Sequence, residues 1–257
     1  MKSLEYKNDN LFFDGIAIEE IAKNIKTPFY IYSEDSIKQN IKGYMSQASQ
    51  KTLFCYSVKA NSNLSLLKLI ASQGMGFDVV SKGELHRAIK AGANTKKIVY
   101  SGVGKTKEEI AYALNNKILC FNVESEEELV AINAQASLMK LKADISIRIN
   151  PDVKVKTHPY ISTGMRENKF GIAYEDAFEI YKKAKQLDSI NIVGIDFHIG
   201  SQIMSIEPYL DSISSVKKLI QKLDTIDIKL SHIDVGGGLG ISYKGEKLVD
   251  KSEYVKT

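Results

Sequence analysis

The sequence predicts an α/β fold, a TIM-type (β/α)8 barrel that is truncated after its seventh strand. Three observations lead to this prediction. Short apolar runs alternate with segments of helical spacing, most runs recur at about the length of one strand plus one helix, and the later runs alternate between polar and apolar residues. Strand alternating with helix is typical of parallel βαβ units, each with a right-handed crossover.

Seven strand-like runs follow one another along the chain. They lie at residues 52–60, 76–81, 97–101, 118–123, 144–150, 191–199 and 232–235. Apolar residues spaced three or four apart predict helices after residue 64 and after residue 85, and two longer helices over residues 126–139 and 174–187. Two intervals exceed the length of a single unit, and an insertion at residues 152–171 explains one of them.

Two of the later runs place their polar residues on one face. These residues are Asp144, Ser146, Arg148 and Asn150 in the first run, and Gly194, Asp196 and His198 in the second. An open parallel sheet is apolar on both faces, so one polar face favours a barrel with a polar interior. In such barrels, functional residues gather at the C-terminal ends of the strands.

The barrel is expected to be incomplete. Residues 247–257 have the pattern of a helix or loop, and no eighth strand follows the seventh run. Upstream, residues 11–18 and 28–33 are expected to form short strands flanking a helix. We therefore predict two parts, residues 1–33, which belong with a β-sheet domain absent from the sequence, and residues 34–257, the incomplete α/β barrel.

The composition narrows the function class. A formal net charge of +4, with no basic run interleaved with aromatic residues, argues against a nucleic-acid partner. No secretory signal and no membrane-length apolar segment is seen, so a cytoplasmic protein without a membrane partner is expected. Cys55 and Cys120 lie in separate apolar runs and are predicted to be buried, reduced thiols. With four histidines and two scattered cysteines, no metal site is predicted.

Lys59 lies at the C-terminal end of the first apolar run, where a barrel strand presents its last side chain to a substrate. Burying an ammonium group without a partner is strongly unfavourable. A neutral, partly desolvated lysine is also the nucleophile that condenses with an aldehyde or ketone. From this segment alone, a lysine that reaches out to solvent fits equally well.

Glycines end the seventh run, at positions 236–238. Such a turn lets backbone N–H groups approach an anion such as a phosphate, although a plain tight turn is the alternative. It fails the dinucleotide fingerprint because Ile241 occupies the final glycine position. Residues 102–106 suggest a P-loop, but Val99 stands where its first glycine is required. His198, taken alone, has the pattern of a hydrogen-bonded core histidine.

An ordered set of motifs resembles the diaminopimelate decarboxylases, which are pyridoxal-phosphate enzymes of the alanine racemase-like barrel group. The motifs are Tyr56-Ser-Val-Lys-Ala-Asn61, Gly76-Phe-Asp-Val-Val-Ser-Lys-Gly-Glu-Leu85, Ser101-Gly-Val-Gly-Lys-Thr106, Arg148-Ile-Asn-Pro-Asp152, Thr157-His-Pro-Tyr-Ile-Ser-Thr-Gly164, Asn168-Lys-Phe-Gly171, His198-Ile-Gly-Ser-Gln202 and Gly236-Gly-Gly-Leu-Gly240. The lysine, histidine and glycine motifs are shared with ornithine and arginine decarboxylases. The stretches 101–106 and 157–164 are particular to the diaminopimelate branch.

The resemblance implies a pyridoxal 5'-phosphate cofactor and a role for each matching residue. Lys59 would join the cofactor covalently, Asp78 would tune the charge of that lysine, and His198 would stack on the cofactor ring. Ser201 and the glycine turn would bind the phosphate, and Arg148 would lie beneath the ring. The residues so implied are Lys59, Asp78, Arg148, His198, Ser201, Gly236, Gly237 and Gly238, of which Lys59 and His198 are catalytic.

The resemblance further implies decarboxylation of meso-2,6-diaminopimelate to L-lysine and CO2, the last step of lysine synthesis, by a full-length homodimer. Relatives carry a Glu-Pro-Gly-Arg motif on the eighth strand and a C-terminal β-sheet domain, and neither occurs in these 257 residues. The chain alone is therefore expected to have little or no activity. The alternatives are a non-catalytic pyridoxal-phosphate-binding remnant, and a decarboxylase of ornithine, arginine or another polyamine precursor.

Overall fold

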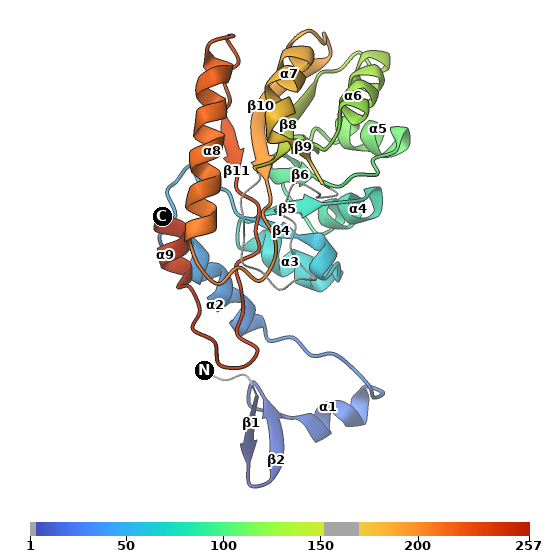
Figure 1. The fold of residues 1–257 in the computed structure, drawn as a ribbon. Coiled ribbons are helices and arrows are strands. Elements are labelled where there is room, and N and C mark those ends of the chain that lie inside the picture. The colour runs from blue at the N-terminus through green and yellow to red at the C-terminus, as the bar shows by residue number, and fades with distance from the viewer. Residues whose placement is uncertain (1–3, 152–169) are drawn as a thin grey trace. The chain divides into compact units, whose positions relative to one another are not determined.

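The computed structural model describes residues 4–151 and 170–257, which form two compact units (Figure 1). The units comprise Met1–Gln50 and Lys51–Thr257, and each is described separately below. The domain boundary after residue 33 stays a prediction. The stretch 157–164 and most of the insertion predicted at 152–171 lie outside the described residues.

The first unit is a small antiparallel sheet followed by two helices. Its elements are β1 (Leu4–Lys7), β2 (Asn10–Phe13), β3 (Ile16–Ala17), α1 (Ile18–Asn24) and α2 (Glu34–Met45). Residues 8–9 and 14–15 connect the strands with positive φ angles, the backbone that two-residue hairpin turns require. The strand predicted over residues 11–18 is thus two short strands and a turn, and β1 was not predicted.

The strand predicted at residues 28–33 is wrong. These residues form no strand, and the three-stranded sheet ends at β3 without a partner for them among the described residues. Ser33 serves instead as the N-cap of α2, since its hydroxyl accepts a hydrogen bond from the Ser36 N–H at 3.0 Å. A β-rich composition is not enough to make a strand where no neighbouring strand supplies hydrogen bonds.

The second unit is a curled parallel half-barrel whose strands follow the order β11-β10-β8-β7-β6-β5-β4. Its strands are β4 (Cys55–Ser57), β5 (Gly76–Val79), β6 (Ile98–Tyr100), β7 (Cys120–Val123), β8 (Ala143–Asn150), β10 (Ile190–Phe197) and β11 (His232–Asp234), and the short β9 (Ile172–Ala173) pairs with the end of β8. All seven predicted barrel strands are confirmed, each somewhat shorter or shifted at its ends. Among the described residues, β4 and β11 are the two edges of the sheet and do not pair with each other.

Helices follow the strands of the half-barrel, and all but the last connect one strand to the next (Figure 1). They are α3 (Leu64–Ser72), α4 (Lys82–Lys90), α5 (Lys107–Asn115), α6 (Glu126–Leu138), α7 (Tyr174–Lys185), α8 (Glu207–Asp224) and α9 (Lys251–Lys256). Four of them begin at a Ser, Thr or Asn side chain that accepts a backbone N–H, namely Asn63, Ser81, Thr106 and Ser125. Of the helices described, none has the length and apolarity that a bilayer crossing demands.

The two faces of the half-barrel differ as the alternation predicts. Ile145, Ile147 and Ile149 of β8 are at most 1% exposed, and α6 and α7 pack on this strand. Burying each such side chain contributes about 1.5–3 kcal/mol. The polar residues of the same strands point the other way. Cys120 is a buried free thiol as predicted, whereas Cys55, on the edge strand, is only partly buried.

Gly76 occupies a position where the packing of two neighbouring strands leaves no room for a side chain. A Cβ there would lie 2.2 Å from the Lys97 carbonyl oxygen and 2.9 Å from Cys55 Sγ. We predict that Gly76→Ala lowers the free energy of unfolding, measured by urea denaturation, by about 1–3 kcal/mol.

Gly83 in α4 provides the matched control, because the nearest atom to a Cβ at this position is 3.8 Å away. Gly83→Ala is expected to be neutral or to add up to about 1 kcal/mol, since alanine favours the helix. A Gly76→Ala protein as stable as the unmodified chain would contradict the packing described here.

Candidate active site at the carboxyl ends of the strands

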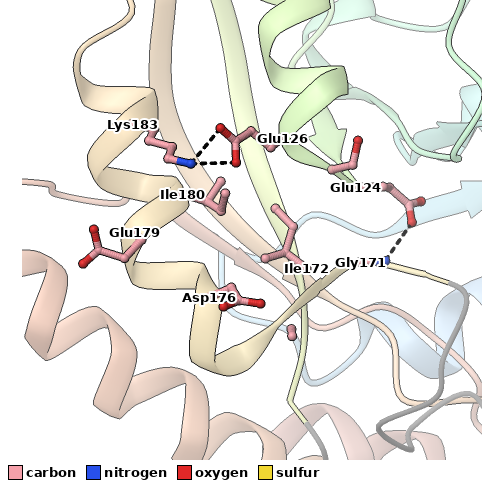
Figure 2. A pocket seen from close by; sticks show the side chains of 10 residues that line it. Glu124, Glu126, Gly171, Ile172, Asp176, Glu179, Ile180 and Lys183 are labelled. Atoms are coloured by element: carbon pink, nitrogen blue, oxygen red, sulfur yellow. Dashed lines mark hydrogen bonds and ion pairs between the residues drawn. The ribbon is translucent and has the colours of Figure 1, made fainter.

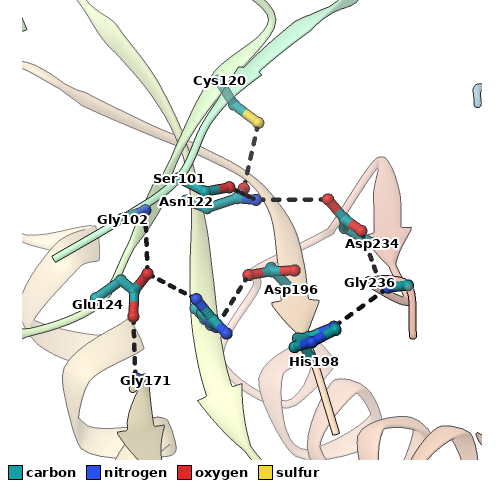
Figure 3. A network of polar contacts seen from close by, with 12 residues as sticks. Ser101, Gly102, Cys120, Asn122, Glu124, Gly171, Asp196, His198, Asp234 and Gly236 are labelled. Atoms are coloured by element: carbon teal, nitrogen blue, oxygen red, sulfur yellow. Dashed lines mark hydrogen bonds and ion pairs between the residues drawn. The ribbon is translucent and has the colours of Figure 1, made fainter. Parts of the chain in front are cut away.

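Most strands of the half-barrel bring polar side chains to one shared face, whereas β6 places Val99 beside Asp78. The strand pairing places several of these polar residues next to each other. Ser57 pairs with Asp78, and Asn122 pairs with Ser146. Arg148 pairs with Asp196, which in turn pairs with Asp234 on the next strand. Polar groups on this face are partly or fully removed from water, so each needs a partner. The result is a connected polar network, part of which Figure 3 shows.

Asp78 lies beside the edge strand that leads to Lys59. Its Oδ2 accepts a hydrogen bond from the Ser57 hydroxyl at 2.8 Å, while its buried Oδ1 has no partner. Burial raises the pKa of Asp78, and hydrogen bonds from Ser101 and Ser57 and the charge of Lys59 oppose that rise. A buried carboxylate oxygen without a donor is costly, and it marks a place where a group outside the described residues could donate.

Lys59 stands in the single 3₁₀ turn Val58–Ala60 that directly follows β4. Its charge acts on both Asp78 and His198. The residue is exposed, which agrees with the alternative of a lysine that reaches out to solvent. The reason is that β4 is an edge strand, and no described strand lies beyond it.

Arg148 projects from β8 between two carboxylates. Its Nη1 donates to Glu124 Oε1 at 2.7 Å, and its Nε lies 3.7 Å from Asp196 Oδ2. Burial, followed by the nearby Asp234, raises the pKa of Asp196 well above its usual value, and Arg148 opposes that rise. The guanidinium also lies 5.4 Å from the centre of the Phe170 ring.

A second set of contacts runs from β7 to the glycine turn. The Asn122 amide donates to Ser101 Oγ at 3.1 Å and to Asp234 Oδ2 at 3.4 Å, and the other oxygen of Asp234 accepts the Gly236 N–H at 2.9 Å. Asn122 is buried. The turn after β11 is thereby fixed by side chains from the middle of the sheet, as Figure 3 shows.

The glycine turn needs its glycines. Gly236 and Gly238 have φ angles of 65° and 98°, and a Cβ on Gly238 would lie 1.9 Å from the Gly200 carbonyl oxygen. A Cβ on Gly237 would meet nothing within 4 Å. The turn is thus packed against the loop after β10 on one side and is open at Gly237. Ser201, the next residue of that loop, is exposed.

His198 lies at the end of β10 and touches the same turn. Its Nδ1 accepts the Gly237 N–H at 3.3 Å, which places the proton of a neutral ring on Nε2. Burial, together with the charges of Arg148 and Lys59, lowers the pKa of His198 to about 4. The imidazole is therefore neutral at pH 7, and it offers an uncharged, flat ring beside the turn.

Most of the predicted site residues meet in this region. The charge of Lys59 acts on Asp78 and on His198, that of Arg148 acts on His198, and the glycine turn contacts His198. Sequence reasoning missed several partners, namely Ser57, Ser101, Asn122, Glu124, Asp196 and Asp234. The alternation of polar and apolar residues placed Asp196 on the polar face. In β4 and β6 the same alternation could not be recognised, because each strand has only three residues.

A shallow pocket of about 370 Å³ lies elsewhere, between the start of α6 and the helix α7 (Figure 2). The Lys183 ammonium bridges it by an ion pair with Glu126 at 2.7 Å. Neither Lys59 nor His198 lines it, so this pocket is not the candidate site.

The lowered pKa of His198 predicts a pH dependence of stability. The unfolded histidine, with a pKa near 6.5, takes up a proton before the folded one does, so stability falls as the pH drops from about 6.5 to 4. The loss attributable to this residue is up to about 3 kcal/mol. We predict that the difference in free energy of unfolding between the unmodified chain and His198→Gln becomes smaller as the pH is lowered from about 6.5 to 4.

Taking the difference cancels the contributions of Asp78 and Asp196, whose raised pKa values have the opposite sign. His86→Gln is the control, because His86 is exposed and bonds only to the Tyr112 hydroxyl among the described contacts. Parallel pH curves for His198→Gln and the unmodified chain would contradict the burial of a neutral imidazole.

Known proteins share both the sequence and this arrangement. The chain is 43% identical to diaminopimelate decarboxylase of Pseudomonas aeruginosa over 257 residues, and 45% identical to that of Vibrio cholerae over 258. It covers 62% of each relative, so it spans about three fifths of their length. The crystal structure of diaminopimelate decarboxylase from Helicobacter pylori complexed with L-lysine matches 93% of the chain and 61% of its own, with a TM-score of 0.89 at 46% identity. A diaminopimelate decarboxylase structure from M. jannaschii matches 99% of the chain and 61% of its own, with a TM-score of 0.92 at 37% identity.

The family assignment rests on the greater part of the chain. Residues 34–257 match the family described as pyridoxal-dependent decarboxylase, pyridoxal binding domain. This range contains the whole half-barrel and every candidate site residue named above. The chain therefore belongs to the pyridoxal-dependent decarboxylase family, and it comprises the pyridoxal-binding domain.

Proposed function

We propose that this chain is the cofactor-binding part of a diaminopimelate decarboxylase, which converts meso-2,6-diaminopimelate to L-lysine and CO2. The observation that carries the proposal is that Lys59, Asp78, His198 and the glycine turn 236–238 all lie at or near the carboxyl ends of the strands, where the charge of Lys59 acts on Asp78 and His198. Similarity of 43–46% to curated diaminopimelate decarboxylases along nearly all of the chain supports the choice of reaction.

The residues present fit pyridoxal phosphate. The turn at Gly236–Gly238 leaves an open side at Gly237, where a Cβ would meet nothing within 4 Å. The neutral ring of His198 suits stacking on an aromatic ring. The unpartnered oxygen of Asp78 suits a donor from the cofactor or from Lys59. These three observations come from separate strands, and they surround one region.

We assign Lys59 and His198 as catalytic residues. Lys59 Nζ would bond covalently to the cofactor aldehyde, and the Asp78 carboxylate would hold that nitrogen by charge. Bound pyridoxal phosphate supplies an electron sink for the electrons of the bond between the α-carbon and the carboxylate. His198 would lie flat on the cofactor ring and exclude water from that face, and Arg148 would lie beneath the ring.

The phosphate would be held by the turn. The N–H groups of Gly236 and Gly237 already donate to Asp234 and His198, which leaves the N–H of Gly238 as the donor of the turn. The Ser201 hydroxyl would be a second donor. Since Gly238 packs directly on the Gly200 carbonyl, the two donors would sit on neighbouring backbone segments.

The full-length protein would act as a cytoplasmic homodimer on a small amino-acid substrate. The free thiols of Cys55 and Cys120 support a reducing compartment. Because the chain spans about three fifths of its relatives, the complete reaction is assigned to the full-length protein and not to these 257 residues.

Covalent trapping tests the cofactor site directly. We predict that incubation of the chain with pyridoxal phosphate, followed by borohydride reduction and peptide mapping, yields one adduct, on Lys59. Lys59→Met should abolish it. Lys97→Met, which removes a lysine bonded to the Gly74 carbonyl oxygen, should leave it unchanged.

Gly238→Ala should lower the yield of the Lys59 adduct about tenfold or more at limiting cofactor, because the new Cβ displaces the turn. Gly83→Ala should not change the yield. Scattered labelling over many lysines in the unmodified chain would contradict a formed cofactor site.

Substrate choice is tested on the full-length protein by CO2 release. We predict turnover of meso-2,6-diaminopimelate with kcat/KM at least about 10³-fold above that for L-ornithine or L-arginine, since a site that pairs a distal charged group rejects analogues lacking it. The 257-residue chain should release at most a trace. Preference for ornithine or arginine would overturn the substrate assignment, and no turnover of any of the three by a folded, cofactor-loaded protein would favour the non-catalytic remnant.

A further inference from the structure

Lys105, in the loop between β6 and α5, is a buried charge that the proposed function does not use. Its side chain is 1% exposed. The ammonium donates to three acceptors, the Gly102 carbonyl at 2.7 Å, the Asn122 carbonyl at 2.8 Å and Glu128 Oε1 at 2.5 Å. An ammonium group has three donors, so all of them are taken.

Glu128, in the first turn of α6, connects Lys105 to the next carboxylate. Its second oxygen accepts the Glu124 N–H at 3.0 Å. Burial raises the pKa of Glu128, and the charge and hydrogen bond of Lys105 oppose the rise. Lys105 thus favours the ionised form of Glu128 and holds its carboxylate in place, and Glu128 fixes the backbone at Glu124.

Glu124 directly follows β7, and its side chain is 3% exposed. Its Oε1 accepts from the Gly102 N–H at 3.1 Å and from Arg148 Nη1 at 2.7 Å, and its Oε2 accepts from the Gly171 N–H at 3.2 Å. Figure 3 shows the carboxylate between Gly102 and Gly171. Donors from three segments leave this carboxylate one orientation.

These contacts close a ring. It runs from the Lys105 ammonium to Glu128, from Glu128 to the Glu124 backbone, from the Glu124 carboxylate to the Gly102 N–H, and from the Gly102 carbonyl back to Lys105. Among the described contacts, Arg148 is attached to the ring through Glu124. Asp196 is a longer contact of 3.7 Å, and the Phe170 ring lies beside the guanidinium. The position of the guanidinium is therefore set mainly by Glu124.

The ring also explains the motif at residues 101–106, which is not a phosphate loop. Gly102 has a φ of 98°, Lys105 supplies the ammonium of the ring, and Thr106 is the N-cap of α5 with a complete capping box to Glu109. The lysine of the motif points to protein oxygens, all of them in the described part of the chain.

We propose that Lys105 is a positioning residue for Arg148, which it holds in place through Glu128 and Glu124. The inference deepens the proposed function, and it rests on that function only in so far as Arg148 serves the cofactor. No contact of Lys105 itself with cofactor or substrate is involved.

The test measures solvent exchange of the Arg148 Hε proton by NMR, in the absence of cofactor. The sequence contains only the arginines Arg87, Arg148 and Arg166, so the Nε–Hε signals are few, and single Arg→Lys variants assign them. In the double variant Lys105→Met/Glu128→Gln, no buried charge of that pair is left alone, so folding is favoured. We expect Arg148 Hε to exchange with solvent about tenfold or more faster than in the unmodified chain.

The matched control is Lys183→Met/Glu126→Gln. It removes an ion pair of similar length, 2.7 Å, at the same helix α6, but this pair is half-exposed and does not touch Glu124 or Arg148 among the described contacts. Exchange of Arg148 Hε in the control should match the unmodified chain. A general loosening of the fold would instead accelerate exchange in both variants in proportion to their lost stability.

Unchanged Arg148 exchange in a folded Lys105→Met/Glu128→Gln protein would overturn the inference. Should that variant fail to fold, Glu128→Gln alone decides by the same signal, with faster exchange supporting the inference and unchanged exchange refuting it. Borohydride trapping on Lys59 of the unmodified chain reports separately on the proposed function, so the two failures are distinguishable.

Discussion

The ion pair between Arg148 and Glu124 is the interaction on which the rest of the site depends. It lies at the centre of the concave face, joins β7 to β8, and ties both to Gly102 and Gly171 through the same carboxylate. Removing one member of a buried pair costs about 3–5 kcal/mol, because the remaining charge is left without a partner. Asp196 lies beside this pair, with its Oδ2 3.7 Å from Arg148 Nε, whereas the glycine turn is held by Asp234 and His198.

The half-barrel separates packing from chemistry by strand alternation. One face of each strand buries isoleucine and other apolar side chains under the helices, and this face holds the fold together. The opposite face carries carboxylates, amides and hydroxyls that satisfy one another. Because parallel strands end at the same edge, residues as distant in sequence as Asn122 and Asp234 come within hydrogen-bond distance.

Much of the fold could be predicted from the sequence, because period-two runs and helical spacing are strong local signals. All seven barrel strands and the helices α6 and α7 were found this way. Residues 28–33 misled the prediction, since local composition does not report whether a partner strand exists. The hairpin strand β1 was missed because its pairing with β2 depends on the turn at residues 8–9, which was not predicted.

The site was predicted less completely. Lys59, Asp78, Arg148, His198 and the glycines were found from motifs, but their partners were not. Glu124 and Glu128 were not among the predicted site residues, because only the three-dimensional closure of a loop onto α6 makes them a buried network. The sequence left open whether Lys59 is exposed, since its exposure follows from the position of β4 at the sheet edge.

The most direct measurement is a crystal structure of the chain grown with pyridoxal phosphate. The account predicts electron density continuous with Lys59 Nζ, a phosphate against Gly238 and Ser201, and the cofactor ring on the imidazole of His198. Cofactor attached to another lysine, or a phosphate seated away from the glycine turn, would contradict the claim that these strand ends form the cofactor site.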